Sequence, residues 1–168
     1  MKALIVYFSR AGENIVGDER EIIEKGFTEI VAEKIQKLTG GALIKLQPEE
    51  EYPFGYDDCN RRARKEYEEN ILPVVKNLPA SIDAYDTIFL GFPLWYRSYP
   101  RIIASFLKQY SFLGKVVKPF CTNEEGSFGF MELELRGAVK GAIVKEGLAI
   151  RGYDAEKSDE VVANWVAK

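Results

Sequence analysis

Hydroxyl and glycine residues follow the first predicted strand, in a stretch that reads YFSRAGEN from Tyr7. Ser9 lies in this stretch, and Thr28 belongs to the helical pattern GFTEIVAEKI that begins after an acidic interval. A phosphate monoester can accept hydrogen bonds from such hydroxyls and from the free N–H groups at the start of a helix. The alternative is that Ser9 only ends a strand and Thr28 only caps a helix.

The same loop excludes two familiar nucleotide motifs. It contains no Gly-Lys-Ser/Thr and no Gly-x-Gly-x-x-Gly, so it matches neither a Walker loop nor a dinucleotide fingerprint. A ligand smaller than a dinucleotide therefore fits better.

Aromatic side chains crowd a second stretch, GFPLWYRSYP, which begins at Gly91. Trp95, Tyr96 and Tyr99 have little neighbouring sequence in which to be buried, so we expect exposed rings. Such rings could stack on a planar heterocycle while backbone groups reach its polar edge. The alternative is that they pack under the neighbouring loop as a local cluster.

Apolar runs and helical periodicities alternate along the chain. The predicted strands cover residues 3–8, 42–46, 87–92, 116–121 and 147–151. The predicted helices cover residues 28–40, 57–69, 100–107, 131–144 and 158–166, with Thr28 and Ser158 as N-caps. Strands that alternate with helices require right-handed crossovers and a sheet covered on both faces. We therefore predict a doubly wound, three-layer α/β sandwich with a five-stranded parallel sheet.

Ligands of this architecture bind beyond the carboxyl ends of the strands. Three loops lie at that edge, covering residues 9–27, 93–99 and 122–130. We expect the candidate site to be built from these three loops.

Composition removes several classes of chemistry. The 168 residues are 46% hydrophobic, carry a net charge of −3 and include no histidine. The absence of histidine excludes Ser-His-Asp and Cys-His nucleophiles and the commonest metal ligand. We therefore expect no catalytic side chain, no metal and chemistry supplied by a bound cofactor. Cys59 and Cys121 are expected to be free thiols. Scattered Lys and Arg residues do not support a nucleic-acid partner.

No apolar run reaches the roughly 18 residues of a membrane span, and the N-terminal ALIVYF is too short for a signal peptide. We expect one domain over residues 1–168, located in the cytoplasm.

Taken together, these motifs resemble the flavodoxin family. The resemblance is carried by YFSRAGEN with KGFTEIVAEKI, by YDTIFLGFPLWY, by YP before RIIASFL, and by GKVVKPFCTNEEGSFG, in family order over nearly the whole chain. It implies a flavodoxin-like strand order, 2-1-3-4-5, and a non-covalent FMN site. The implied cofactor-binding residues are Ser9, Arg10, Ala11, Gly26, Phe27, Thr28, Pro93, Leu94, Trp95, Tyr96, Arg97, Thr122, Asn123, Glu124 and Gly126.

Within this set the resemblance implies three roles. Ser9, Arg10 and Thr28 would hold the phosphate, and the flavin ring would lie against Trp95 or Tyr96. Glu124 and its neighbour would lower the flavin potential if they point inward, and would be plain surface carboxylates otherwise.

The chain departs from the family pattern in each loop. Residues 15–25 resemble an insertion that splits the compact phosphate loop, and this insertion could be a partner surface or a tolerated surface excursion. Phe27 stands where relatives often carry Asn, and Glu125 with Phe128 interrupts the glycine pattern of the third loop.

Arg97 stands where many relatives carry Gly. The resemblance places it at a turn that favours positive φ, which costs a residue with a side chain roughly 1–2 kcal/mol. Either the turn resists this conformation, or the backbone of Arg97 already has it and the side chain projects into solvent.

The leading function implied by the resemblance is an FMN-binding electron-transfer protein, whose partners are FMN and a redox partner protein or small electron acceptor. The alternative is an FMN-dependent NAD(P)H:quinone-type oxidoreductase, which would need an open face over the ring. A flavin-free receiver module is disfavoured, because it needs acidic residues at strand ends where this chain has Ser9 and Pro93.

Overall fold

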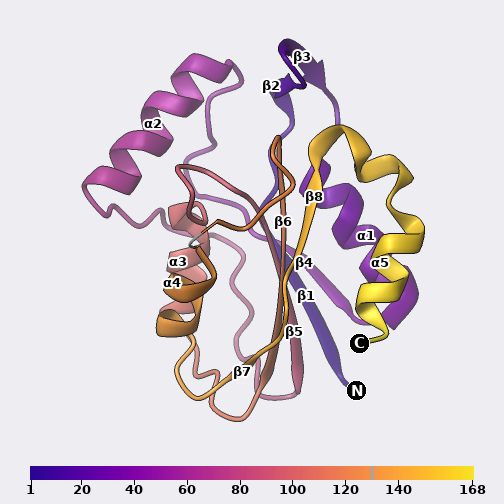
Figure 1. Ribbon diagram of the computed structural model, residues 1–168. Helices are drawn as coiled ribbons and strands as arrows, with labels where there is room; N and C mark the ends of the chain where they lie inside the picture. Colours follow the sequence, from indigo (N-terminus) through magenta and orange to yellow (C-terminus); the bar gives the residue numbers. More distant parts are fainter. Residues whose placement is uncertain (130) are drawn as a thin grey trace.

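Six strands form a parallel sheet in the computed structural model, which describes residues 1–129 and 131–168. The strand order is β4-β1-β5-β6-β7, and β8 also pairs with β6 (Figure 1). Phe130, the last residue of the predicted third loop, lies outside the described residues. The strands are β1 (Ala3–Tyr7), β4 (Ala42–Lys45), β5 (Thr87–Pro93), β6 (Val116–Asn123), β7 (Ile143–Val144) and β8 (Leu148–Arg151).

Helices cover both faces of this sheet (Figure 1). One face carries α1, α5 and the short 3₁₀ helix η1, and the other carries α3 and α4, with α2 near the carboxyl ends of the strands. No helix within the described ranges is both long and apolar enough to cross a membrane. The helices are α1 (Phe27–Thr39), α2 (Tyr56–Glu68), α3 (Arg101–Leu107), α4 (Met131–Ala138), η1 (Gly152–Lys157) and α5 (Asp159–Val166).

The apolar run of β1 is buried on both faces, as a central parallel strand requires. Leu4 and Val6 belong to the core that α3 covers, whereas Ile5 and Tyr7 belong to the core that α1 covers. This alternation fixes the orientation of β1, and with it the place where Ser9 leaves the sheet.

The helix predicted over residues 131–144 ends early. α4 stops at Ala138, and the chain then turns at Gly141, whose φ of 80° is left-handed. Ile143 joins the sheet instead, donating its N–H to the Lys115 carbonyl at 2.9 Å. The α/β architecture with a parallel sheet is confirmed. The predicted count of five strands is wrong, because the edge beside β6 is divided between β7 and β8.

A β-hairpin forms within the first loop, where we expected an insertion over residues 15–25. β2 (Gly12–Val16) pairs antiparallel with β3 (Glu19–Ile23), and Gly17 and Asp18 form the connection. Gly17 has a φ of 64°, which two-residue hairpin turns favour. The Gly17-Asp18 pair between two short runs is a hairpin signal in the sequence.

Two buried groups make the stability of the fold sensitive to alkaline pH. Burial raises the pKa of the Cys121 thiol to about 12, and burial beside Glu134 raises the pKa of Tyr99 to about 12. The native state therefore keeps protons that the unfolded chain releases above its ordinary pKa values of about 9 for Cys and 10 for Tyr. The stability from these protons is complete below about pH 9 and is lost as the pH rises toward 12.

We expect the free energy of unfolding to fall by up to about 1.4 kcal/mol per pH unit for each titrating group above its unfolded pKa. Urea unfolding at about pH 8 and about pH 10.5 measures this loss. Cys121→Ala should reduce the pH dependence even though it lowers stability at both values. An unchanged dependence in that variant would contradict the assignment.

Candidate functional site

The three predicted loops meet at Thr122, near the carboxyl end of β6. The hydroxyls of Thr122 and Thr28 share a hydrogen bond of 2.8 Å, and the Thr122 carbonyl accepts the N–H of Leu94 at 3.0 Å. Both threonines are buried. These bonds join the start of α1, the loop after β5 and the end of β6 at the edge where a doubly wound sheet binds its ligands.

The two halves of the first loop lie against each other despite the hairpin between them. Ser9 Oγ accepts the N–H of Glu29 at 3.1 Å, so a hydroxyl from the end of β1 caps α1 across the loop. Gly26 is the N-cap residue of α1. The prediction that Thr28 caps this helix is therefore wrong, and its hydroxyl is engaged by Thr122 instead.

Gly26 has no room for a side chain. A Cβ at this position would overlap Ser9 Oγ and would lie 2.7 Å from the carbonyl oxygen of Arg10. The φ of Gly26 is −67°, which any residue can adopt, so close packing rather than backbone conformation requires glycine here. The contact brings the end of β1 to the first N–H groups of α1.

The start of α1 offers donors for an anion. The first N–H groups of a helix have no intrahelical acceptor, and Ser9 satisfies only that of Glu29. Within the described chain, no residue accepts the N–H of Phe27 or Thr28. The Glu29 carboxylate is paired with Lys45 at 2.6 Å, which offsets its charge. The positive end of the helix dipole therefore favours an anion at this position.

Backbone carbonyls of three residues bind the Arg10 guanidinium. It donates to the carbonyls of Pro53 at 3.0 Å, Phe54 at 2.6 Å and Glu13 at 2.6 Å. These contacts do not support the expected phosphate role of Arg10, and they indicate that it shapes the first loop by tying it to the segment before α2. Ala11 is half-buried beside it.

The second loop closes as a tight turn between Trp95 and Ser98. Their N–H groups donate to each other's carbonyls at 2.9 Å and 3.0 Å. The central residues, Tyr96 and Arg97, have φ values of 52° and 59°, as in a type I′ turn. Arg97 thus already has the positive φ expected at its position, which costs roughly 1–2 kcal/mol for a residue with a side chain.

The aromatic residues of this loop divide between core and surface. Trp95 packs edge-on against Phe8 and Tyr52, with ring centroids 5.5 Å and 5.4 Å apart, so it belongs to a local cluster. Tyr99 is 4% exposed, and its expected exposure is wrong. Tyr96 remains at the surface, with 37% of its area exposed.

Tyr96 bridges the second loop and α2. Its ring stacks on that of Tyr67 at a centroid distance of 5.8 Å and an interplanar angle of 18°. Its hydroxyl hydrogen-bonds to the side-chain oxygen of Asn60. Partial burial raises the pKa of Tyr96, so its phenol stays protonated at neutral pH.

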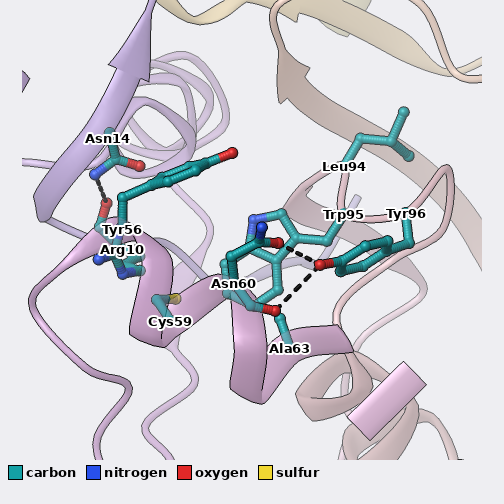
Figure 2. Close-up of a pocket in the computed structure, with 9 residues that line it drawn as sticks. All are labelled: Arg10, Asn14, Tyr56, Cys59, Asn60, Ala63, Leu94, Trp95 and Tyr96. Carbon is teal, nitrogen blue, oxygen red and sulfur yellow. Dashed lines mark hydrogen bonds between the residues drawn. The ribbon is translucent and has the colours of Figure 1, made fainter. Parts of the chain in front are cut away.

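A pocket of about 350 Å³ lies beside this turn (Figure 2). Neutral amides, phenols and an indole provide flat apolar surface and hydrogen-bonding groups, which suit a planar heterocycle. Asn14, Tyr56 and Asn60 were not predicted from the sequence, because the hairpin and α2 meet the second loop only in the folded chain. The pocket is lined by Arg10, Asn14, Tyr56, Cys59, Asn60, Ala63, Leu94, Trp95 and Tyr96.

The third loop is a turn centred on Asn123. The Asn123 side chain accepts the N–H of Gly126 at 2.6 Å and donates to the Ser127 carbonyl at 2.7 Å. Gly126 has a φ of 67°, which favours glycine, and it lies against Arg151. Glu125 is exposed. The side chain of Asn123 therefore shapes the loop.

Hydrogen bonds join the hairpin to the third loop and to α2. At its tip, the N–H of Gly17 donates to the Glu124 carboxylate at 2.9 Å. On β3, Arg20 donates to both oxygens of Asp57, at 2.7 Å and 2.9 Å. Partial burial, with Asp18 nearby, raises the pKa of Glu124, and the Gly17 N–H opposes this shift. The carboxylate of Glu124 is thus bound to the hairpin.

The family model for flavodoxins matches residues 22–168 of this chain. The chain belongs to the flavodoxin family. The match covers the second and third loops and the half of the first loop that begins α1. In this flavodoxin, β1 and the residues that follow it lie upstream of the matched range.

Solved structures similar to this flavodoxin share its fold over nearly the whole chain. A candidate flavoprotein from Bacteroides uniformis is 28% identical, with a TM-score of 0.77 and coverage of 99% of this chain and 98% of that chain. One from Bacteroides eggerthii is 30% identical, with a TM-score of 0.70 and coverage of 96% and 98%. A Lactobacillus acidophilus flavoprotein in complex with FMN is 22% identical, with a TM-score of 0.65 and coverage of 94% and 96%. The comparison with curated proteins finds no match.

Two N-cap glycines provide a matched test of the packing at the first loop. Gly26 and Gly55 have nearly the same φ, −67° and −71°, but a Cβ at Gly55 meets no atom of the described chain within 4 Å. We expect Gly26→Ala to lower the free energy of unfolding by about 1–3 kcal/mol. Gly55→Ala should change it by less than about 0.5 kcal/mol. Urea unfolding of the ligand-free proteins measures both, and equal effects would contradict the close packing.

Proposed function

We propose that this flavodoxin binds FMN non-covalently and serves as an electron-transfer protein. The observation that carries the proposal is the junction at Thr122, where the three loops share hydrogen bonds at the ligand edge of the sheet. Membership of the flavodoxin family and the FMN-bound relative from Lactobacillus acidophilus support the same cofactor.

The split first loop fits a phosphate monoester. Ser9 is an acceptor for the N–H of α1, so its hydroxyl proton is free to donate to phosphate. The N–H groups of Phe27 and Thr28 would donate as well. The bond between Thr28 and Thr122 uses one of their two hydroxyl protons, which leaves the other available. Gly26 allows the two halves to meet.

The pocket beside the second loop fits the flavin ring. Trp95 or Tyr96 would provide a flat face, and the amides of Asn14 and Asn60 would provide polar partners for the ring. Further contacts would come from Pro93, Leu94 and Arg97 of the second loop and from Thr122, Asn123, Glu124 and Gly126 of the third.

The chain's own groups would bind and orient the cofactor, and FMN supplies the electron-accepting and electron-donating chemistry when bound. Burial raises the pKa of Cys59, and partial burial raises that of Tyr96, so both side chains stay neutral at neutral pH. The carbonyls around Arg10 hold its guanidinium at the wall of the pocket. These residues exclude water and fix position, and none of them needs to transfer a proton.

The absorption spectrum of the purified or reconstituted protein tests this function. We expect flavin bands near roughly 370 and 450 nm, and release of FMN on denaturation. We also expect no turnover of a small acceptor with NAD(P)H alone. Rapid turnover would favour the FMN-dependent NAD(P)H:quinone-type oxidoreductase, and failure to bind FMN would contradict both functions.

The hydroxyl of Ser9 provides a test of the phosphate position. We expect Ser9→Ala to weaken FMN binding by about 1–2 kcal/mol, because one hydrogen bond to a charged group is lost. Riboflavin, which lacks the phosphate, should bind both proteins equally well. Fluorescence titration of the ligand-free proteins measures all four affinities.

Ser158→Ala is the matched control. Ser158 is a buried serine that precedes α5 as its N-cap residue, and its hydroxyl donates to the Ala155 carbonyl of η1. This substitution should leave FMN affinity unchanged. An equal loss of riboflavin affinity in Ser9→Ala would show that Ser9 only supports the fold.

A further inference from the structure

The turn in the second loop holds an unfavourable backbone conformation. A type I′ turn favours Asn-Gly at its centre, because both residues need positive φ. Here the central residues are Tyr96 and Arg97. Elsewhere in the described ranges, the only other non-glycine residue with positive φ is Asn70, and asparagine tolerates this region. Such a conformation persists only where the surroundings impose it.

A buried arginine holds one side of this turn. Arg101, the first residue of α3, is 9% exposed, and its Nη2 lies 2.9 Å from Ser98 Oγ and 3.1 Å from Glu134 Oε1. The same nitrogen lies 3.2 Å from the Tyr99 carbonyl. Ser98 Oγ donates in turn to Glu134 Oε2 at 2.5 Å. Ser98, which closes the turn, is therefore held by both members of an ion pair.

α2 holds the other side of the turn. Tyr96 hydrogen-bonds to Asn60 and stacks on Tyr67. The Arg101 guanidinium lies 5.6 Å from the centroid of the Tyr67 ring. Arg101 therefore also contacts the turn through Tyr67, whose ring stacks on that of Tyr96.

Stability alone does not explain why Arg101 is buried. Its Nε is buried without a hydrogen-bond partner among residues 1–129 and 131–168. The Glu134 side chain is 41% exposed, so the burial cost falls on the Arg101 guanidinium, and the unmet Nε donor adds to that cost. The buried charge of Arg101 therefore indicates a geometric role. That role is to fix the shape of the second loop.

We propose that Arg101 is a positioning residue that, through Ser98 and Glu134, holds the Trp95–Ser98 turn in its cofactor-ready form before FMN binds. The inference rests on the proposed FMN role of the second loop. A loop that is already ordered does not have to be ordered by the ligand, so preorganisation raises affinity.

A double-mutant cycle tests this coupling in wild type, Arg101→Met, Arg97→Gly and the double variant. Met retains apolar volume without the guanidinium, and Gly removes the cost of positive φ. When position 97 is Arg, we expect Arg101→Met to weaken FMN binding about tenfold. This factor corresponds to the cost of one residue in the left-handed region. In the Arg97→Gly background the loss should be several-fold smaller, because only Tyr96 then keeps the cost of positive φ. Flavin fluorescence titration of the ligand-free proteins gives the four affinities.

Arg136→Met is the matched control, because Arg136 forms a second Arg–Glu pair on α4, with Glu132 at 2.7 Å. It should change FMN affinity by less than about twofold. Equal losses from Arg101→Met in both backgrounds would overturn the inference, since Arg101 would then act through something other than the strained turn.

NMR of the ligand-free proteins gives a readout that does not need FMN. Positive φ produces a strong intraresidue HN–Hα NOE, and those of Tyr96 and Arg97 should weaken in Arg101→Met. Unchanged NOEs would overturn the inference. A wild type that does not bind FMN would contradict the proposed function, while the NOEs still decide the role of Arg101. If Arg101→Met does not fold, Glu134→Gln replaces it with the same expectations.

Discussion

The buried hydrogen bond between Thr28 and Thr122 is the interaction on which the ligand edge of this flavodoxin depends. It joins the first turn of α1 to the end of β6 at 2.8 Å. Leaving either buried hydroxyl without a partner would lower the free energy of unfolding by about 1–3 kcal/mol. The pair therefore fixes the helix against the strand. Because Ser9 caps the same helix and Leu94 donates to the Thr122 carbonyl, one junction sets the relative positions of all three loops.

A hairpin is a form of insertion that leaves this junction intact. Its register places Gly12 opposite Ile23, and directly opposed residues of an antiparallel pair lie only about 5 Å apart. The chain therefore returns close to where it left, and Gly26 can still pack against Ser9. The hairpin also contributes Asn14 to the pocket, so it is both a tolerated insertion and a wall of the candidate site.

The sequence was sufficient to predict the parallel architecture and the three loops, because apolar runs of β-branched residues identify buried strands and strand ends locate the ligand edge. It was less informative where distant contacts decide the outcome. Two of the three carbonyls that orient the Arg10 guanidinium lie more than forty residues away, and the hydroxyl of Thr28 is held by a strand 94 positions later. Asn60 joins the pocket only because α2 packs beside the second loop.

Isothermal titration of the ligand-free wild type with FMN and with riboflavin tests the central claim most directly, because the two ligands differ only in the phosphate that the reassembled first loop would hold. We expect FMN to bind at least about 100-fold more tightly, which corresponds to two or more hydrogen bonds to a charged group. Equal affinities for the two ligands would contradict a phosphate site at Ser9 and the start of α1.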